Sequence, residues 1–403
     1  MKKQLIAAAV LAATAATASA ADIKLYGRVD VGFSGNYNSY VATLPNGHKE
    51  HQDTHSFKMD SGNTTGSRFG LTGTEDQGKG YKVGFVLEQG FSADSGNASN
   101  AGRAFHRESS VNVQTPFGTV YAGRLNSLIA DAGSIGVYGD LISPFGTGWG
   151  NNAGHAEVFV AQYRFNNTVA YASPKLGAAQ FFLQYSMGDG NENESSTDRY
   201  YAAAAMVDLG KLQLGFLVDY LNKNSVYDKA KFGNVDVDDT ITLNAGATYD
   251  CGFAKSYLAA QYFKNASNVG DNNELISEFV DGFGLLPGGV TIDGWGVNAG
   301  VAFPLLGGNY KLSVGFSKGD AEYNGTDIGD VKIFSVLTGW TYNISKRTST
   351  YVGASYAQHK LDIDPLGLSV KSKNAQAASD FLKWATTDEG ALAKWKEWGF
   401  EMA

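Results

Sequence analysis

Arginines on the polar side of alternating segments are the first groups in this sequence that could do chemistry. In residues 22–33 and 66–74 apolar residues alternate with polar ones, and Arg28 and Arg68 fall on the polar face. A guanidinium stays charged at any relevant pH and keeps a fixed geometry of donors. Arg107 is out of phase with its segment, so it reaches the polar face only if a bulge intervenes. The sequence therefore predicts fixed positive charge along one polar face.

A hydrolytic site would need a nucleophile, a base and an orienting group within reach of one another. His106, Glu108 and Ser110 come nearest to such a site, because they share one face of an expected strand. Side chains four residues apart on a strand are too far apart to touch. An outer-membrane lipase or protease is therefore the weakest of the functional alternatives.

Two polar segments hold residues of the kinds that bind metal ions. The first group, which could bind zinc or nickel, consists of His48, Glu50, His51, Asp53 and His55. The second group, which could bridge a divalent cation to lipopolysaccharide, consists of Asp236, Asp238 and Asp239. We expect a solvated loop in both places, and the sequence predicts no cofactor and no metal.

The N-terminus is typical of a secretory signal peptide over residues 1–20, with Lys2 and Lys3, an apolar stretch and a small-residue cleavage site. The chain has a net charge of −8, and loss of these two lysines makes it more acidic, so no nucleic-acid partner is expected. The single cysteine, Cys251, excludes an internal disulfide and a cysteine-based metal site. No later apolar run reaches the roughly 18 residues of a membrane-spanning helix. Residues 21–403 are therefore interpreted as one all-β unit.

Segments with one polar and one apolar face recur along the chain, as in residues 240–249, 310–317 and 334–342. A soluble β-sandwich would pack the apolar faces together. Here the polar face is rich in small residues, and aromatic residues flank the short turns, as they do at a membrane interface. We therefore predict that the polar face lines a watery interior and that the apolar face meets lipid.

Short and long connections alternate along the chain. The short links cover residues 76–80, 115–118, 173–177, 209–211, 250–253, 304–308 and 345–347. The long polar segments cover residues 35–55, 93–102, 126–156, 188–198, 222–238, 265–292, 319–330 and 360–397. This rhythm predicts a transmembrane antiparallel β-barrel of about 16 strands, with tight periplasmic turns and long outer loops. A closed barrel of this size has no free edge and encloses a water-filled lumen.

Four stretches, in order along the chain, resemble the general porins of β-proteobacteria. They are residues 25–30 (LYGRVD), 66–76 (GSRFGLTGTED), 117–124 (FGTVYAGR) and 163–174 (YRFNNTVAYASP). Each motif is weak alone, but together they cover nearly the whole chain after the signal peptide. The resemblance implies a passive diffusion channel for small hydrophilic solutes and ions in the outer membrane of a Gram-negative bacterium. It also implies a homotrimer of 16-stranded barrels embedded in lipid and lipopolysaccharide.

The same resemblance implies that a third outer loop, residues 125–156, folds inward and narrows the pore. The pore constriction would then be formed by Arg28, Arg68, Arg107, Arg124, Arg164, Asp140 and Asp131. Among these residues, Asp140 matches a constriction acid of related porins, whereas Asp131 is a weaker candidate. The chain departs from the family at the loop tip, where Pro144 replaces a glutamate.

A positive wall facing a negative loop would produce a transverse field, which salt screens beyond about 8–10 Å. Because arginines outnumber acids, we expect mild anion selectivity, unless some arginines lie in loops or pair with Asp30 or Glu88. The alternative of a substrate-specific channel, such as a sugar porin, would need an aromatic slide through the pore. Tyr26 and Tyr138 are too few to form one.

The alternation ends after Lys360. Residues 373–397 carry large apolar residues at spacings near three or four, which predicts a helical outer loop packed at the barrel mouth or, alternatively, a plugging or partner-binding segment. Trp398, Phe400 and Met402 alternate again, as at the beginning of a last strand. A full membrane strand needs about 9–11 residues, so we expect this strand to be truncated and the sequence to be a fragment.

Overall fold

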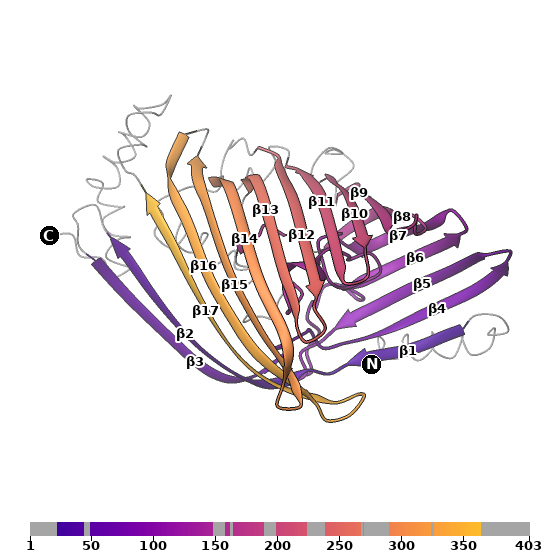
Figure 1. Cartoon of the computed structure of the whole chain (residues 1–403), viewed down its shortest axis with the longest axis horizontal. Coiled ribbons are helices and arrows are strands. Elements are labelled where there is room, and N and C mark those ends of the chain that lie inside the picture. The colour runs from indigo at the N-terminus through magenta and orange to yellow at the C-terminus, as the bar shows by residue number, and fades with distance from the viewer. Residues whose placement is uncertain are drawn as a thin grey trace.

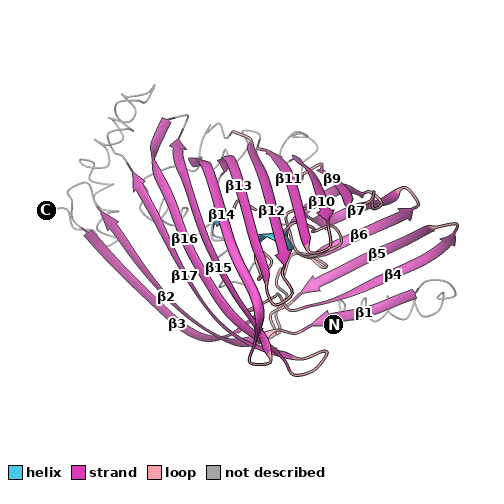
Figure 2. Cartoon of the chain, in the orientation of Figure 1, coloured by secondary structure: helices cyan, strands magenta, loops and turns pink. Residues whose placement is uncertain are grey.

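Antiparallel strands make up most of the computed structural model, which describes residues 22–43, 49–147, 158–161, 164–188, 199–223, 238–266, 269, 290–323 and 326–363. Fifteen strands form one curved sheet that runs from β1 through β4 to β17, while β2 and β3 pair with each other (Figure 1). The short helix α2 (Gly139–Ile142) lies within the curve of this sheet (Figure 2). The all-β antiparallel fold expected from the alternation is confirmed.

The strands follow one another along the chain with these bounds. Those of the first half are β1 (Asp22–Arg28), β2 (Val31–Thr43), β3 (Lys49–Ser61), β4 (Arg68–Gly78), β5 (Tyr81–Gly90), β6 (Glu108–Thr115), β7 (Gly118–Asn126), β8 (Arg164–Ala172) and β9 (Ala179–Ser186). Those of the second half are β10 (Arg199–Asp208), β11 (Leu212–Asn222), β12 (Thr240–Asp250), β13 (Lys255–Ala266), β14 (Val290–Leu305), β15 (Gly308–Tyr323), β16 (Thr326–Asn343) and β17 (Ser349–Ile363).

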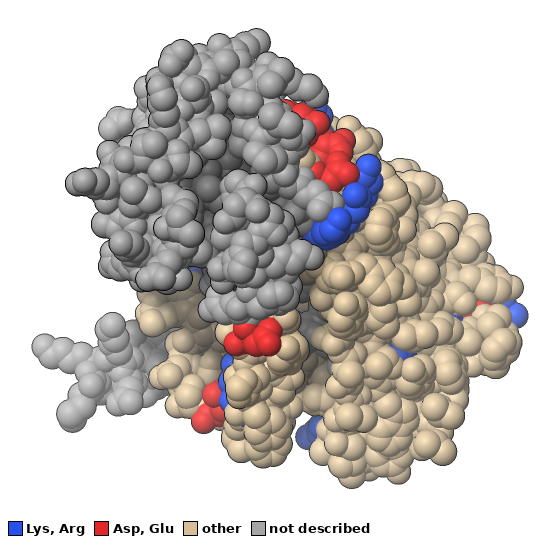
Figure 3. Space-filling view, turned by 90° about the vertical axis from the view of Figure 1, so that its left-hand side faces the viewer, with Lys and Arg blue, Asp and Glu red and all other residues tan. Residues whose placement is uncertain are grey.

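The polar face of the sheet is the buried one. On β12, Thr242 and Asn244 are buried, whereas Leu243 between them is 48% exposed. The same inversion separates buried Gln261 from exposed Leu258 on β13. A soluble sandwich buries its apolar faces instead, so this sheet has the arrangement of a membrane barrel. Figure 3 shows that the described part of one side of the molecule is mostly uncharged, with charged side chains in small groups.

Every short link expected from the sequence joins two consecutive antiparallel strands. The first of them lies between β4 and β5, where Gly78 and Gly80 have φ values of 78° and 83°, which favour glycine. The others join β6 to β7, β8 to β9, β10 to β11, β12 to β13, β14 to β15 and β16 to β17. All these links therefore lie at the same end of the sheet, and the long segments lie at the other.

The first expected strand, residues 22–33, is interrupted in the structure. β1 ends at Arg28 and β2 begins at Val31, because Asp30 turns its carboxylate toward the link between β3 and β4. The Asp30 carboxylate accepts hydrogen bonds from the backbone N–H of Thr64 and of Thr65, both at 2.9 Å. The chain bends there, and the β2–β3 hairpin leaves the main sheet (Figure 1).

Two of the expected long loops are extended hairpins instead. The segment 35–55 lies in β2 and β3, whose ladder continues to the pair Thr43 and Lys49. The segment 319–330 lies in β15 and β16, which pair as far as Tyr323 and Thr326. Both segments are polar on their two faces, so no alternation marks them as strands, but backbone pairing does not require alternation outside the lipid. β14 and β17 also extend into expected loops, beginning at Val290 and ending at Ile363.

The free edges of the main sheet belong to β1 and β17. No ladder joins these two strands among the described residues. A side-chain hydrogen bond connects β17 with the residues that follow β1, since the Tyr351 hydroxyl on β17 donates to the Asp30 carboxylate at 2.5 Å. The expected signal peptide (1–20), helical loop (373–397) and last strand (398–403) lie outside the described residues.

In the described part of the chain, no helix is both long enough and apolar enough to span a membrane.

Candidate pore constriction

The segment between β7 and β8 folds against the inner, polar face of the sheet. Its described parts are residues 127–147 and 158–161, and many of its side chains are buried, including Leu128, Ile135 and Leu141. Helix α2 of this segment contacts β11, β12 and β13. The described parts of this segment, called the pore loop below, therefore fold inward, and helix α2 lies on the concave side of the sheet (Figure 2).

Small residues on the sheet make room for this loop. Gly215 and Gly246 are register partners on β11 and β12. A Cβ at Gly215 would overlap the Leu141 side chain, and one at Gly246 would lie 3.0 Å from the Tyr138 hydroxyl. At Gly296 an added Cβ would overlap the backbone oxygen of Val158. The small residues on the polar face therefore leave the space into which the loop packs.

Polar side chains of the sheet hold the loop backbone. Gln261 on β13 accepts a hydrogen bond from Val160 N at 2.6 Å and donates to Val160 O at 2.8 Å. Gln184 on β9 accepts from Leu128 N at 3.1 Å, and Asn298 on β14 donates to Ile142 O at 2.8 Å. Each unmade bond of this kind would cost about 1–3 kcal/mol in a buried site, so these contacts fix where the loop crosses the lumen.

Arg28 and Arg68 face each other across the β1–β4 ladder, on the lumen side. Tyr26 shares this face, because its hydroxyl donates to Glu88 on β5 at 2.9 Å. Arg68 Nε lies 3.7 Å from the same carboxylate. No carboxylate lies within ion-pair distance of Arg28 among the residues that the structure describes. The alternation thus placed both arginines on the face where the structure has them.

Arg107 joins this group without the bulge that the alternation required. It lies in a bend just before β6, which begins at Glu108, so strand alternation does not apply to it. Its Nε is 2.7 Å from Glu88 Oε1. Glu88 therefore pairs with Arg68 and Arg107 together, which is the pairing that the sequence left open as an alternative.

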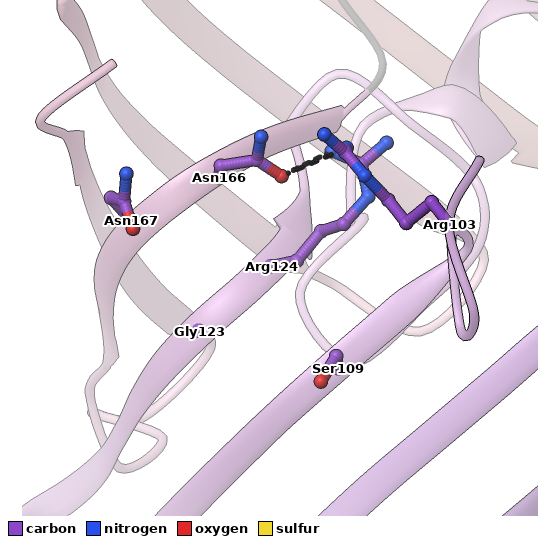
Figure 4. A pocket seen from close by; sticks show the side chains of 6 residues that line it. All are labelled: Arg103, Ser109, Gly123, Arg124, Asn166 and Asn167. Carbon is purple, nitrogen blue, oxygen red and sulfur yellow. Dashed lines mark hydrogen bonds between the residues drawn. The ribbon is translucent and has the colours of Figure 1, made fainter. Parts of the chain in front are cut away.

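Arg124 lies on the other face of the sheet by register. It pairs with Ser109, two positions from the outward pair Val111 and Ala122. The β7–β8 register shifts between Gly123 and Leu125, and Arg124 lies opposite the resulting bulge. Arg103 and Arg124 converge there on the Asn166 side-chain oxygen, at 3.1 and 2.6 Å (Figure 4).

Arg164 belongs to the same group of charges. Its register partner Asn126 donates to Ala132 O of the pore loop at 2.5 Å. The charges of Arg107, Arg124, Glu88 and Arg68 all act on the Arg164 guanidinium. The Arg164 Nε donates to the backbone oxygen of Arg107 at 3.1 Å. The structure therefore gathers Arg28, Arg68 and Arg107 around Glu88, and it places Arg124 and Arg164 against the backbone of residues 106–107.

His106 lies among these arginines, in the loop between β5 and β6. Burial, together with the positive charges of Arg164, Arg107 and Arg124, lowers the pKa of His106 to about 4. Its Nδ1 is buried, with no hydrogen-bond partner among the described residues. His106 is thus neutral at physiological pH. Ser110 donates to Glu108 at 2.7 Å rather than to His106, so the base and the nucleophile weighed for a hydrolytic site are not paired.

The two expected acids do not face the arginines. Asp131 accepts hydrogen bonds from Thr147 N at 2.8 Å and from Thr147 Oγ1 at 2.9 Å. It therefore links two parts of the pore loop to each other. Asp140 is exposed on α2, where its charge interacts with those of Asp131, Lys255 and Lys311. Charge at the loop and charge at the arginine group therefore belong to separate clusters.

The other residues singled out in the sequence have local roles. Tyr138 is buried against the sheet and is not displayed to a passing solute. Asp239 accepts from Lys223 N at 2.8 Å and from Asn222 Nδ2 at 3.2 Å, which caps the end of β11. His55 and Asp53 lie on β3, opposite Tyr37 and Ser39. The described residues contain no group of three metal-ligating side chains; His48 and Asp236 lie outside them.

Sequence reasoning did not single out Gln261, Asn298, Lys255 or Lys311. Gln261 and Asn298 stand among small residues on the polar face, which is a signal for contacts with something inside the barrel. Lys255 directly follows a short link and Lys311 lies three residues after β15 begins, and a single lysine near a turn carries no such signal. Their importance depends on a loop that comes from more than a hundred residues earlier in the chain.

An antiparallel sheet with lipid-facing apolar residues, a polar concave face and a loop folded across it is the architecture of an outer-membrane channel. The comparisons with known proteins give the family. Residues 7–362 match the Gram-negative porin family. The chain belongs to this family, and it is a channel protein of the outer membrane rather than an enzyme.

Individual relatives agree with this assignment. The chain is 30% identical over 385 residues to an outer membrane porin protein of Bordetella pertussis, covering 89% of this chain and 95% of the relative. It is 30% identical over 382 residues to outer membrane porin protein 32 of Delftia acidovorans, covering 92% and 93%. The solved anion-selective porin from Comamonas acidovorans has the same fold, with a TM-score of 0.60 at 22% identity, covering 84% of this chain and 90% of that chain.

Proposed function

We propose that this porin admits small hydrophilic solutes with a mild preference for anions, and that Arg28, Arg68 and Arg107 set this preference. The observation that carries the proposal is the shared carboxylate of Glu88, which pairs with Arg68 and Arg107. The third lumen-side guanidinium, that of Arg28, has no ion pair among the described residues. Fixed charge of one sign in a narrow aqueous passage raises the local concentration of the opposite ion.

Two further observations support this preference. Asp140 and Asp131, which would have balanced the arginines, are engaged elsewhere. The solved porin from Comamonas acidovorans, which shares the fold, is anion-selective. The negative net charge of the chain does not oppose the proposal, because selectivity depends on charge at the narrowest part of the passage rather than on the total.

The test is the reversal potential of the full-length protein in a planar bilayer under a salt gradient. We expect an anion-preferring sign, which the variant R28Q/R68Q shifts toward cations. The control is K346Q/R347Q, which removes two exposed positive charges from the last short link and should leave the reversal potential unchanged. A clear cation preference of the unaltered protein, or equal shifts in the two variants, would refute the assignment of the arginines.

We further propose a homotrimer that contacts lipid and lipopolysaccharide. The exposed apolar side chains along the outer face, such as Leu25, Val111 and Leu258, need to be covered by acyl chains or by neighbouring subunits. Native mass spectrometry in detergent, together with conductance that rises in groups of three equal steps, tests the trimer. A single mass and isolated single steps would contradict it.

A further inference from the structure

We propose that Lys255 and Lys311 form a second anion site at the short-link end of the lumen, which takes small oxyanions such as phosphates and is moderated by Asp140. This inference extends the proposed function and rests on a passage that is open to anions. It does not depend on the arginine group, which lies on other strands.

Both lysines belong to the same level of the sheet. Lys255 is the first residue of β13, and Lys311 lies three residues after β15 begins. Ala302 of β14 is the register partner of each of them. Neighbouring strands are about 4.8 Å apart, so the two backbones lie roughly 10 Å apart. Long, flexible side chains can bring both ammonium groups to one small anion across that distance.

Alternation directs both side chains into the lumen. On β13, Lys255 shares its face with buried Ala259 and Gln261. On β15, Lys311 shares its face with buried Ser313. Since side chains on a strand alternate between its two faces, neither lysine points toward lipid.

An aromatic ring positions each lysine. The Lys255 ammonium lies 5.3 Å from the centroid of the Tyr257 ring. The Lys311 ammonium lies 5.5 Å from that of Phe145, in the pore loop. Cation–π contacts of this kind hold an ammonium in place without neutralising it. Both groups therefore keep a full charge that is available to a ligand.

Three acidic residues lie near these lysines: Asp140 on α2, Asp131, which acts on the Asp140 carboxylate, and Asp250, the register partner of Lys255. The lysines act electrostatically on the Asp140 carboxylate. The Asp140 side chain is exposed on α2. Neither ammonium group lies in an ion pair among the described residues. Both can therefore turn toward a multivalent anion, which Asp140 repels.

The site is separate from the arginine group along the pore. Lys255 directly follows the short link after β12, whereas Arg68 lies ten residues before the end of β4 at the corresponding link. The arginines stand on β1 and β4 or next to β6, while the lysines stand on β13 and β15. An anion passing through the lumen would therefore meet the arginine group and the lysine pair one after the other, on different parts of the wall.

The experiment is block of single-channel chloride current by tripolyphosphate, added to the short-link side or to the long-loop side. In the unaltered protein we expect tighter block from the short-link side. The variant K255Q/K311Q should raise the half-blocking concentration on that side by about three- to tenfold, and D140N should lower it by about the same factor, which is the range for partly screened charges. The combined variant should behave like K255Q/K311Q, because Asp140 acts through its effect on the same ligand.

The arginine variant R28Q/R68Q keeps this result separate from the proposed selectivity. It should shift the reversal potential and leave the short-link-side block within about twofold, since salt screens the arginines from the lysines. Unchanged block in K255Q/K311Q, with channels of normal conductance in molar salt, would overturn the lysine site. Block that disappears only in R28Q/R68Q would overturn it as well and would leave the arginine proposal standing.

Discussion

Gln261 pairs with both backbone polar groups of Val160, a residue 101 positions earlier in the chain, at 2.6 and 2.8 Å. The side-chain amide therefore replaces a neighbouring strand for one residue of the pore loop. A single wall residue thus ties the far end of the loop to the middle of β13. The width of the passage therefore depends on the contacts that hold the pore loop to the wall as well as on the number of strands in the wall.

The first prediction concerns this tie. Q261A leaves Val160 N buried without a partner, which costs about 1–3 kcal/mol, so we expect the loop end to detach and the open current to become noisier and larger. Q261E should act similarly, because a carboxylate cannot donate to Val160 O. Single-channel recordings measure the effect. Quiet channels of unaltered conductance in both variants would show that the loop is held elsewhere.

The second prediction concerns Glu88, which binds Arg68, Arg107 and Tyr26. E88Q removes the negative charge between the arginines and keeps the volume of the side chain. We expect a reversal potential further toward anion preference, since positive charge beside the passage is then uncompensated. E75Q, at an exposed position of β4 near the short link, provides the control. A shift toward cations in E88Q would contradict the proposed role of this cluster.

The third prediction concerns the glycines of the sheet against which the pore loop packs. G296A places a Cβ on the Val158 backbone oxygen, which cannot move as a flexible side chain can. We expect displacement of the loop, with altered conductance and a melting temperature lowered by several degrees. G35A, whose added Cβ would find its nearest neighbour 3.5 Å away on Phe57, should change neither quantity. Equal conductance and equal melting temperatures in the two variants would argue against a role of Gly296 in packing the loop.

The fourth prediction concerns His106, whose pKa is lowered to about 4 from the ordinary histidine value of 6.5. Burial and the neighbouring arginines favour the neutral ring in the folded protein. As pH falls from about 6.5 to about 4, the unfolded chain therefore binds the proton more readily, and the free energy of unfolding decreases. NMR titration of histidine resonances, assigned with H106Q, measures the pKa. R124Q should raise it, and a value near 6.5 in the unaltered protein would contradict the cluster.

Much of the fold could be predicted from the sequence, because alternation and turns are local properties. The links at 76–80 and 115–118 are correct because a tight turn needs few residues and shows its own composition. Arg28 and Arg68 are on the expected face because a two-residue period fixes the face wherever the strand is regular. The hairpin segments 35–55 and 319–330 were missed because strands outside lipid need no apolar face.

The sequence by itself determined an all-β chain with one polar and one apolar face, and it determined arginines on the polar one. Only the tertiary structure decided which charges meet. A bulge beside Arg124 places it against the loop at residue 106, and the pore loop carries Asp140 across the lumen to Lys255 and Lys311. Charges interact through space over distances of several ångströms. Partners from opposite walls therefore cannot be read from spacing along the chain, however regular that spacing is.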